Sequence, residues 1–185
     1  MIYWGYGKGK TSSALGVALR ALGQGQRVLI VQFMKCGDKE GWQTGEEIMF
    51  NKLRAQGAQV EFHIAGKGWV SIMGDKKPFE EHEAAAREGL EFVMSLLRST
   101  GSPSASQRDF DLIILDEILS AVDSTLLTVE DIKELIAVKP PQVHLLMTGH
   151  KEYSELAEMA DLVTKMEKVK HPYDKGIKAQ KGVDF

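Results

Sequence analysis

Short apolar runs alternate with amphipathic segments along most of the chain. Apolar runs bounded by polar or glycine-rich residues predict buried strands, whereas apolar positions that recur every three or four residues predict helices. The expected strands cover residues 2–4, 27–33, 59–63, 111–116, 142–147 and 162–166. The expected helices cover residues 10–22, a segment ending near 55, and residues 80–98 and 129–138.

The alternation of strands and helices predicts an α/β fold. A strand, a helix and a second strand in succession fold through a right-handed crossover, so the strands are parallel and helices cover both faces of the sheet. The Ser-rich stretch 99–107 is expected to be a mobile loop and not a domain linker, because a strand follows it directly. We therefore expect residues 1–185 to form a single domain with about six mostly parallel strands.

Composition narrows the class of protein. The chain has 185 residues, of which 43% are hydrophobic and 26% charged, as is ordinary for a soluble globular protein. Its net charge of -3 favours neither a nucleic-acid-binding nor a membrane-surface function. A single cysteine, Cys36, cannot form an internal disulfide, which favours a cytoplasmic location. No apolar run is long enough to span a bilayer, and we expect no signal peptide before the first strand.

A glycine-rich loop between the first strand and the first helix is the first candidate site. Its sequence, GYGKGKT at residues 5–11, has three alternating glycines and two lysines. The glycines free the backbone to point N–H groups inward, the helix start adds its dipole, and the hydroxyl of Thr11 suits a magnesium ion. The pattern predicts a phosphate-binding loop that is one residue short, because Trp4 stands where such loops have their first glycine. A flexible glycine turn is the weaker interpretation.

Two carboxylates follow an apolar strand further along the chain. Asp116 and Glu117 come directly after the run 112–115. Ligands gather at the carboxyl ends of parallel strands, and proteins with a phosphate loop place an acidic metal partner for the loop's threonine there. Acidic residues also cap helices, so this signal is ambiguous alone. Together with the loop, it favours a metal site.

Two further segments carry weaker signals. The Lys-rich segment 168–182 is expected to be solvated or to bind nucleic acid, judged by its charge alone. Trp69 lies in a loop between Gly66, Gly68 and Gly74. Such an aromatic side chain either fills a gap in the core or faces a flat ligand.

These motifs resemble those of the P-loop type of ATP:corrinoid adenosyltransferases, also called cob(I)alamin adenosyltransferases. The matching segments, in the family's order, are 5–11 (GYGKGKT), 31–35 (VQFMK), 114–117 (ILDE), 147–149 (MTG) and 169–182 (VKHPYDKGIKAQKG). The shortened loop and the tail are specific to this family. The resemblance implies a three-layer P-loop NTPase-like (RecA-like) fold. It also implies transfer of the 5′-deoxyadenosyl group of ATP to Co(I) of a corrinoid, with release of triphosphate and formation of adenosylcobalamin, adenosylcobinamide or adenosylcobyrinate.

The resemblance also implies roles for individual residues. The implied catalytic residues are Lys10, Thr11 and Glu117, and Mg²⁺ or Mn²⁺ would be held by Thr11, Glu117 and Asp116. The implied nucleotide-binding residues are Gly5, Tyr6, Gly7, Lys8, Gly9, Lys10, Thr11, Ser12, His171, Asp174 and Lys178. The implied corrinoid-binding residues are Trp69 and Lys67. No flavin or iron–sulfur signature is present, so we expect an external, flavodoxin-like reductant, and we expect a homodimer.

The chain departs from the family pattern in three places. Lys67 replaces the first aromatic residue of the loop that meets the corrinoid, which puts displacement of cobalt's lower axial ligand in doubt. His150 stands where relatives usually have arginine after Thr-Gly. An N-terminal segment that caps the partner subunit's site in relatives is expected to be absent.

Two other functions stay open at this point. A phosphotransferase or ATPase could use the same loop, but nucleotide kinases carry several arginines in a mobile lid. The arginines of this chain are scattered at Arg20, Arg27, Arg54, Arg87, Arg98 and Arg108. A non-catalytic carrier that binds ATP and corrinoid is the second alternative, and Lys67 favours it.

Overall fold

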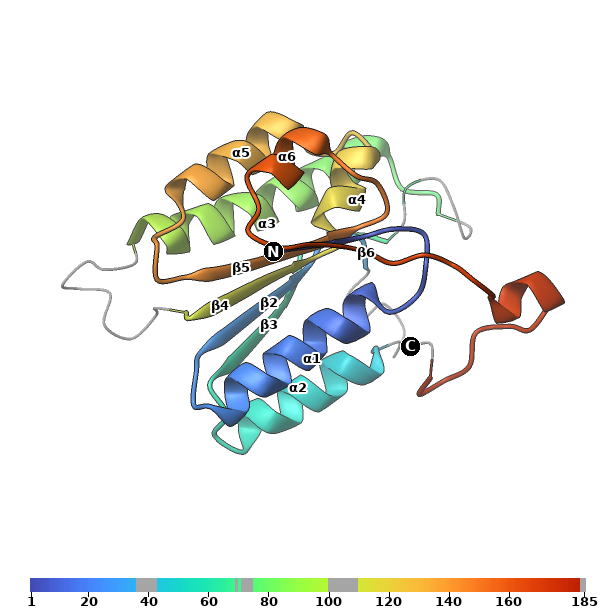
Figure 1. Ribbon diagram of the computed structural model, residues 1–185, viewed down its shortest axis with the longest axis horizontal. Coiled ribbons are helices and arrows are strands. Elements are labelled where there is room, and N and C mark those ends of the chain that lie inside the picture. Colours follow the sequence, from blue (N-terminus) through green and yellow to red (C-terminus); the bar gives the residue numbers. More distant parts are fainter. Residues whose placement is uncertain (36–42, 69, 71–74, 100–109, 184–185) are drawn as a thin grey trace.

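The computed structural model describes residues 1–35, 43–68, 70, 75–99 and 110–183 (Figure 1). In this part of the chain, parallel strands form one sheet in the order β3-β2-β4-β5-β1-β6. The strands are β1 (Ile2–Trp4), β2 (Val28–Gln32), β3 (Val60–Ile64), β4 (Leu112–Asp116), β5 (His144–Gly149) and β6 (Val163–Lys165). The predicted α/β fold with a parallel sheet of six strands is confirmed.

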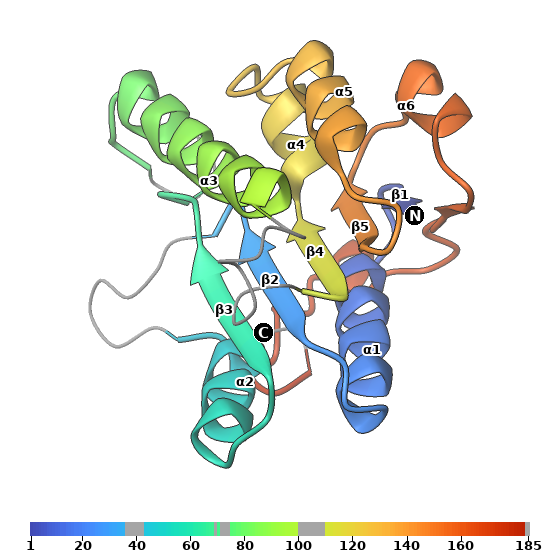
Figure 2. The same cartoon turned by 90° about the vertical axis from the view of Figure 1, so that its left-hand side faces the viewer.

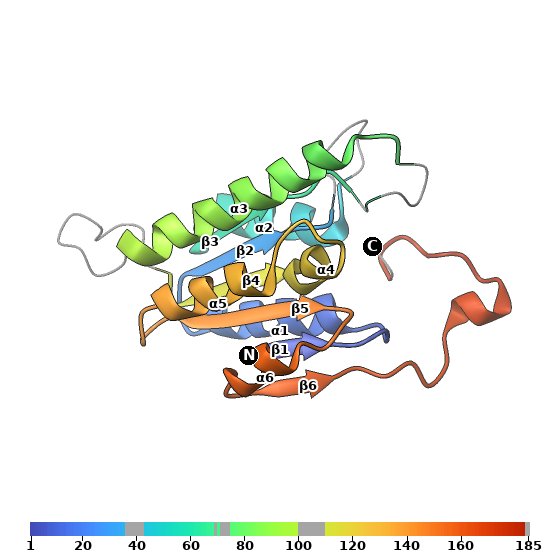
Figure 3. The same cartoon turned by 90° about the horizontal axis from the view of Figure 1, so that it is seen from above.

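Helices cover both faces of the sheet and make three layers (Figure 2). One face carries α1 (Lys10–Gly23) and α2 (Gly45–Ala55). The other face carries α3 (Phe79–Ser99), α4 (Ile118–Asp123), α5 (Val129–Val138) and α6 (Ser154–Glu158). A 3₁₀ helix, η1 (Pro172–Lys175), lies in the tail beyond β6 (Figure 3). Within the described ranges, no helix combines the length and apolar composition that crossing a bilayer requires.

The sequence pattern missed the short helices. The helices α4, α6 and η1 were not predicted, because segments of four to six residues complete too few turns to show a helical period. The stretch 99–107 was predicted to be a loop, but Ser99 is the last residue of α3. The rest of that stretch lies outside the described residues.

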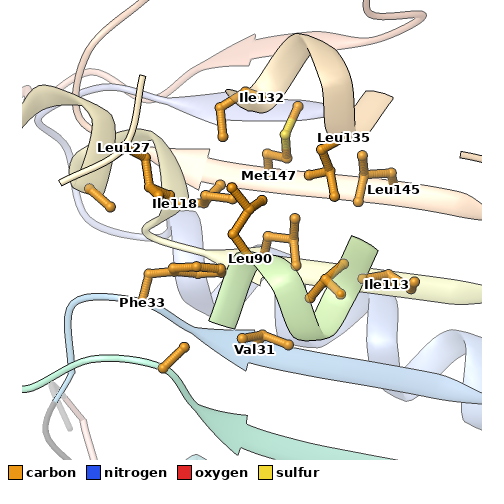
Figure 4. Close-up of a cluster of buried hydrophobic side chains, with 14 of the residues drawn as sticks. Val31, Phe33, Leu90, Ile113, Ile118, Leu127, Ile132, Leu135, Leu145 and Met147 are labelled. Carbon is orange, nitrogen blue, oxygen red and sulfur yellow. The ribbon is translucent and has the colours of Figure 1, made fainter. Parts of the chain in front are cut away.

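Alternate residues of the central strands build two separate cores. Odd-numbered side chains such as Val31, Ile113 and Leu145 face α3, α4 and α5 and join the larger cluster (Figure 4). Even-numbered side chains such as Ile30 and Ile114 face α1 and α2. Because the strands are buried on both faces, they read as continuous apolar runs, as expected for a covered parallel sheet.

The parallel register brings the predicted motifs to one edge of the sheet. Gln32 of β2 pairs with Asp116 of β4, and Trp4 of β1 pairs with Gly149 of β5. These residues are the last of their strands, so the glycine loop after β1 and the two carboxylates at the end of β4 lie at the same carboxyl edge. The fold therefore brings together residues more than a hundred positions apart in the sequence.

Candidate functional site

The glycine loop is shaped by close contact with the chain that follows β6. Gly5 and Gly9 have φ angles of 129° and 108°, in the region that favours glycine. A Cβ atom on Gly5 would lie 2.3 Å from the carbonyl oxygen of Met166, and one on Gly7 would lie 2.7 Å from the same oxygen. The Gly7 N–H donates to that oxygen at 2.9 Å. The loop thus lies directly on the backbone at the end of β6, and only glycine fits at both contacts.

Lys10, the first residue of α1, is folded into the loop. Its Nζ donates to the carbonyl oxygens of Gly5 at 2.7 Å and Gly7 at 3.1 Å, and only 6% of the residue is exposed. Burial lowers the pKa of Lys10, and the nearby carboxylates of Glu117 and Asp116 partly offset this effect. An ammonium group is therefore held inside the loop, where an anion would meet the start of α1.

Asp116 is the hub of the carboxyl edge. Its fully buried carboxylate accepts hydrogen bonds from Thr11 Oγ1 at 2.9 Å and Thr148 Oγ1 at 2.8 Å. Gln32 Nε2 donates to the second carboxylate oxygen at 3.0 Å. The hub thus joins α1, β2, β4 and β5, and the predicted metal partners Thr11 and Asp116 lie in contact.

Glu117 has a different environment, although it is the next residue. Its backbone is left-handed, with φ 61° and ψ 20°, and its N–H donates to Thr148 Oγ1 at 2.8 Å. Its carboxylate accepts a hydrogen bond from Ser120 Oγ. Ser120 Oγ also contacts His150 Nδ1 at 2.9 Å, so His150, Ser120 and Glu117 form a chain of polar contacts.

His150 also contacts the loop. Its ring stacks on Tyr6, with centroids 5.8 Å apart and an interplanar angle of 27°. Tyr6 is otherwise exposed over 74% of its surface. The residue at the family's arginine position therefore connects the loop to Glu117, in place of a guanidinium group.

A third group of side chains lies beyond Asp116, at the end of β2. Lys35 Nζ lies 2.7 Å from Glu46 Oε1 and 3.8 Å from Asp116 Oδ2. Glu46 is in the first turn of α2. Burial disfavours ionisation of Glu46, but the Lys35 hydrogen bond and charge outweigh it and lower the pKa of Glu46.

These groups surround a cleft of about 750 Å³. The residues that line it are Tyr6, Gly7, Lys8, Gly9, Lys10, Thr11, Ser12, Leu15, Lys35, Gly45, Glu46, Glu117, His150, His171, Gly182 and Val183. The tail beyond β6 contributes three of these residues after running away from the sheet and returning (Figure 1). The cleft thus contains most of the nucleotide-binding residues predicted from the sequence.

The predicted tail residues are not all brought to the cleft. His171 lines it, and its Nδ1 accepts a hydrogen bond from the Tyr173 N–H at 3.1 Å. Asp174 and Lys178 are exposed outside the cleft lining. A hydrogen bond from Lys168 lowers the pKa of Asp174. His171 and Asp174 thus make these hydrogen bonds with other residues of the tail.

Of the two predicted corrinoid-binding residues, only Lys67 lies within the described part of the chain. Trp69 lies outside the described residues. Lys67 lines a smaller cavity of about 230 Å³ between β3 and α3, together with His63 and Phe92, whose rings lie 4.7 Å apart. Lys67 is therefore not among the residues that line the cleft beside the glycine loop.

The oxygen atoms near Thr11 are suitable ligands for a hard metal ion, but they are too few to complete its coordination. In the described part of the chain, no group of three or more His, Cys, Asp or Glu residues is close enough to hold a metal ion. The donors at hand are the Thr11 hydroxyl and the carboxylates of Asp116 and Glu117. Magnesium sites of this kind use one or two carboxylates and complete their coordination with water and substrate phosphates.

Sequence reasoning missed the partners that orient these groups. Gln32 and Thr148 lie within segments that matched the family, at 31–35 and 147–149, but they were given no role. Ser120 lies one helical turn after Glu117. That spacing could have indicated the Ser120–Glu117 contact, whereas the contacts of Gln32 and Thr148 with Asp116 depend on the strand order.

Comparison with known proteins agrees with this arrangement. The family described as ATP:corrinoid adenosyltransferase BtuR/CobO/CobP matches residues 1–185. The corrinoid adenosyltransferase of Pseudomonas aeruginosa is 34% identical over 100% of this chain and 82% of its own length. That of Escherichia coli is 31% identical over 100% of this chain and 84% of its own length.

A solved structure gives only a distant likeness. The match to domain III of the Thermotoga maritima replication initiation protein DnaA covers 90% of this chain and 53% of the DnaA chain, with 15% identity and a TM-score of 0.38. That similarity is too low to support an inference about function. The whole-length family match and the relatives above, joined to a glycine loop and paired carboxylates at one sheet edge, show that the chain belongs to the ATP:corrinoid adenosyltransferase family.

Proposed function

We propose that this protein transfers the 5′-deoxyadenosyl group of ATP to the Co(I) centre of a reduced corrinoid and releases triphosphate. The observation that carries the proposal is the single cleft lined by the glycine loop, Glu117 and His171 of the tail. It joins a phosphate-binding end to the motif that distinguishes this family from other P-loop proteins. The family match supports the same reaction class.

In this reaction the cobalt nucleophile attacks the ribose C5′ carbon, and the C5′–O bond breaks. The electron pair of that bond leaves with the triphosphate, so negative charge develops on the leaving group. Lys10 and the N-terminus of α1 stabilise that charge where it forms. Lys8, which lines the same cleft, adds a second cation. Stabilisation of the leaving group then accelerates the chemical step.

We propose that Thr11, Asp116 and Glu117 hold a divalent cation such as Mg²⁺ or Mn²⁺. Hydroxyl and carboxylate oxygens are suitable ligands, and phosphate oxygens of ATP complete the coordination. When bound, the ion neutralises charge on those phosphate oxygens. Thr148 and Gln32 fix Asp116, so its carboxylate would keep one orientation toward the ion.

The remaining parts of the proposal rest on the family alone. The corrinoid would contact Trp69 and Lys67, and Asp174 and Lys178 would reach ATP once the tail closes. The electron that forms Co(I) would come from an external, flavodoxin-like reductant. We also propose that two copies form a homodimer in the cytoplasm.

Phosphorus NMR on an anaerobic reaction tests the proposed chemistry. With ATP and chemically reduced cobalamin, inorganic triphosphate should form one for one with the cobalt–carbon bond that visible spectra detect. ATP without reduced corrinoid should stay nearly intact. A steady release of ADP and orthophosphate without corrinoid would overturn the proposal and favour an ATPase. Binding of both ligands without any turnover would favour the carrier.

A further inference from the structure

Lys35 lines the cleft and lies in the matched segment 31–35, but neither the resemblance nor the proposed reaction gives it a role. It follows β2, whose last residue, Gln32, pairs with Asp116 of β4. The Asp116 carboxylate accepts from Thr11 Oγ1, at 2.9 Å to Oδ1 and 3.2 Å to Oδ2, and Lys35 Nζ lies 3.8 Å from Oδ2. Lys35 therefore flanks the proposed metal site from the end of β2, where Glu46 of α2 is its partner.

The Lys35 ammonium group is held in place without being hidden. Its partner Glu46 lies 2.7 Å away, and Gln32 Nε2 reaches the same Glu46 oxygen at 3.4 Å. The Lys35 side chain is 25% exposed, and the residue lines the cleft beside Lys10 and Thr11. A lysine in this position can make contact with an anion in the cleft without moving its backbone.

The Lys35–Glu46 pair and the neighbouring Gln32 contribute too little to stability to account for their arrangement. A partly buried ion pair contributes little net stability, because the loss of water around both charges offsets their attraction. In the described part of the chain, Gln32 Oε1 is also buried without a hydrogen-bond partner. Costs of this kind are typical of binding sites.

We propose that Lys35 is a further phosphate-binding residue, which contacts the triphosphate from the part of the cleft formed by the end of β2 and the start of α2 while Glu46 fixes its position. The assignment rests on the proposed function, in which the triphosphate part of ATP is the leaving group. Triphosphate carries several negative charges, and Lys8 and Lys10 both lie in the glycine loop, on one part of the cleft lining. Lys35 supplies a cation beyond Asp116 and so encloses the anion on two sides.

Calorimetric titration with inorganic triphosphate and magnesium tests this assignment without any turnover. Lys35→Met should weaken triphosphate binding by about tenfold or more, since a charge-assisted hydrogen bond is lost. Lys35→Arg should stay within about threefold of the parent. The matched control is Lys52→Met on the exposed surface of α2, which removes the same charge outside the cleft and should change binding by less than about twofold.

A second background separates direct contact from simple neutralisation of Glu46. In a Glu46→Gln protein, Lys35→Met should still weaken triphosphate binding by about tenfold. Loss of the effect in that background would show that Lys35 acts only on Glu46, and would overturn the inference. Equal binding by Lys35→Met and the parent, or no triphosphate binding by the parent, would also overturn it.

Folding and the proposed reaction are controlled separately. Thermal melts of each variant report folding, and if Lys35→Met alone is unfolded, the Lys35→Gln change in the Glu46→Gln background removes both charges and carries the same comparison. The titration does not depend on which bond of ATP breaks. ADP formation in the NMR experiment would therefore reject the proposed reaction and leave the Lys35 result standing on its own.

Discussion

The glycine-loop region and the tail both contribute to the cleft, but they are built in opposite ways. In the loop region, Lys10 and Asp116 are buried. Lys10 donates to carbonyl oxygens of the loop itself, and Asp116 accepts hydrogen bonds from three distant parts of the chain. In the tail, residues 167–183 are exposed apart from a half-buried His171, and Lys168 donates to Asp174 only six residues away. The loop region is therefore held by buried hydrogen bonds, whereas the described tail side chains are mostly exposed to solvent.

This difference indicates a division of labour between the two regions. A prearranged set of charges stabilises a developing anion without having to reorganise during the reaction. A segment with few tertiary contacts is instead suited to ordering around a substrate. Substitutions in the loop region should therefore affect chemistry or stability, and changes in the tail should affect nucleotide affinity.

The largest effect is expected for Lys10→Ala. Loss of the ammonium group should lower the adenosylation rate by about a hundredfold or more, because the leaving group loses its buried cation. Burial lowers the pKa of Lys10, so its charge costs stability at neutral pH, and this cost shrinks as pH rises through the lowered pKa. The melting temperature should therefore fall by no more than about 3 °C. Turnover close to that of the parent would remove the loop from the mechanism.

The next largest effect concerns Asp116→Asn and is a loss of stability. The amide oxygen of asparagine can still accept from Thr11 and Thr148, but its NH₂ group cannot accept from Gln32 Nε2, so a buried donor is left unpaired. We expect unfolding in urea to show a loss of about 2–3 kcal/mol.

The matched control for Asp116→Asn is Asp123→Asn. Asp123 pairs with Lys151 at the surface, and its loss should cost less than about 0.5 kcal/mol. Equal losses for the two variants would contradict the view that the loop region is held together by its buried hub.

Glu117→Gln should separate metal binding from folding. The amide keeps the size of the side chain and can still contact Ser120, while the left-handed backbone is unchanged. We expect the magnesium concentration for half-maximal rate to rise by about tenfold, with a stability change below about 1 kcal/mol. An unchanged magnesium dependence would assign the metal to Asp116 and Thr11 alone.

Removal of the tail should have the smallest effect on stability. Deletion of residues 168–185 should raise the KM for ATP about fivefold to tenfold, because the proposed contacts of the tail with ATP are lost. The free energy of unfolding should change by less than about 0.5 kcal/mol, since the described tail side chains are mostly exposed. A large drop in stability would show that the tail belongs to the folded core, and the contrast between the regions would fail.

The sequence pattern predicted the layers of the fold, but it did not predict the hydrogen bonds that orient the site residues. Continuous apolar runs predicted the strands, because a sheet covered on both faces requires them at every position. The boundaries moved by a few residues, as for β5, which spans His144–Gly149 and was expected at 142–147. The helix α4 was missed because Ile118–Val122 is buried throughout and shows no polar face.

For the site, the pairing of the loop with the acidic strand end could be predicted, since both are placed by a parallel sheet. The contacts from Gln32 and Thr148 to Asp116 could not, because they depend on β2 and β5 being the two neighbours of β4. No local pattern encodes which strands are adjacent. The proximity of Lys35 to Asp116 could not be predicted for the same reason, because it depends on β2 lying beside β4.

The contact between the glycine loop and the end of β6 has a consequence for how the tail reaches the nucleotide. Because Gly7 is hydrogen-bonded to Met166, the tail begins within the wall of the site, and its arrival is an intramolecular event. A short flexible tether of this kind gives an effective concentration in the millimolar range. The same residues supplied as a free peptide would have to reach about millimolar concentration to replace a deleted tail. Because the tail is covalently attached beside the loop, it needs no high affinity of its own to act at the proposed nucleotide site.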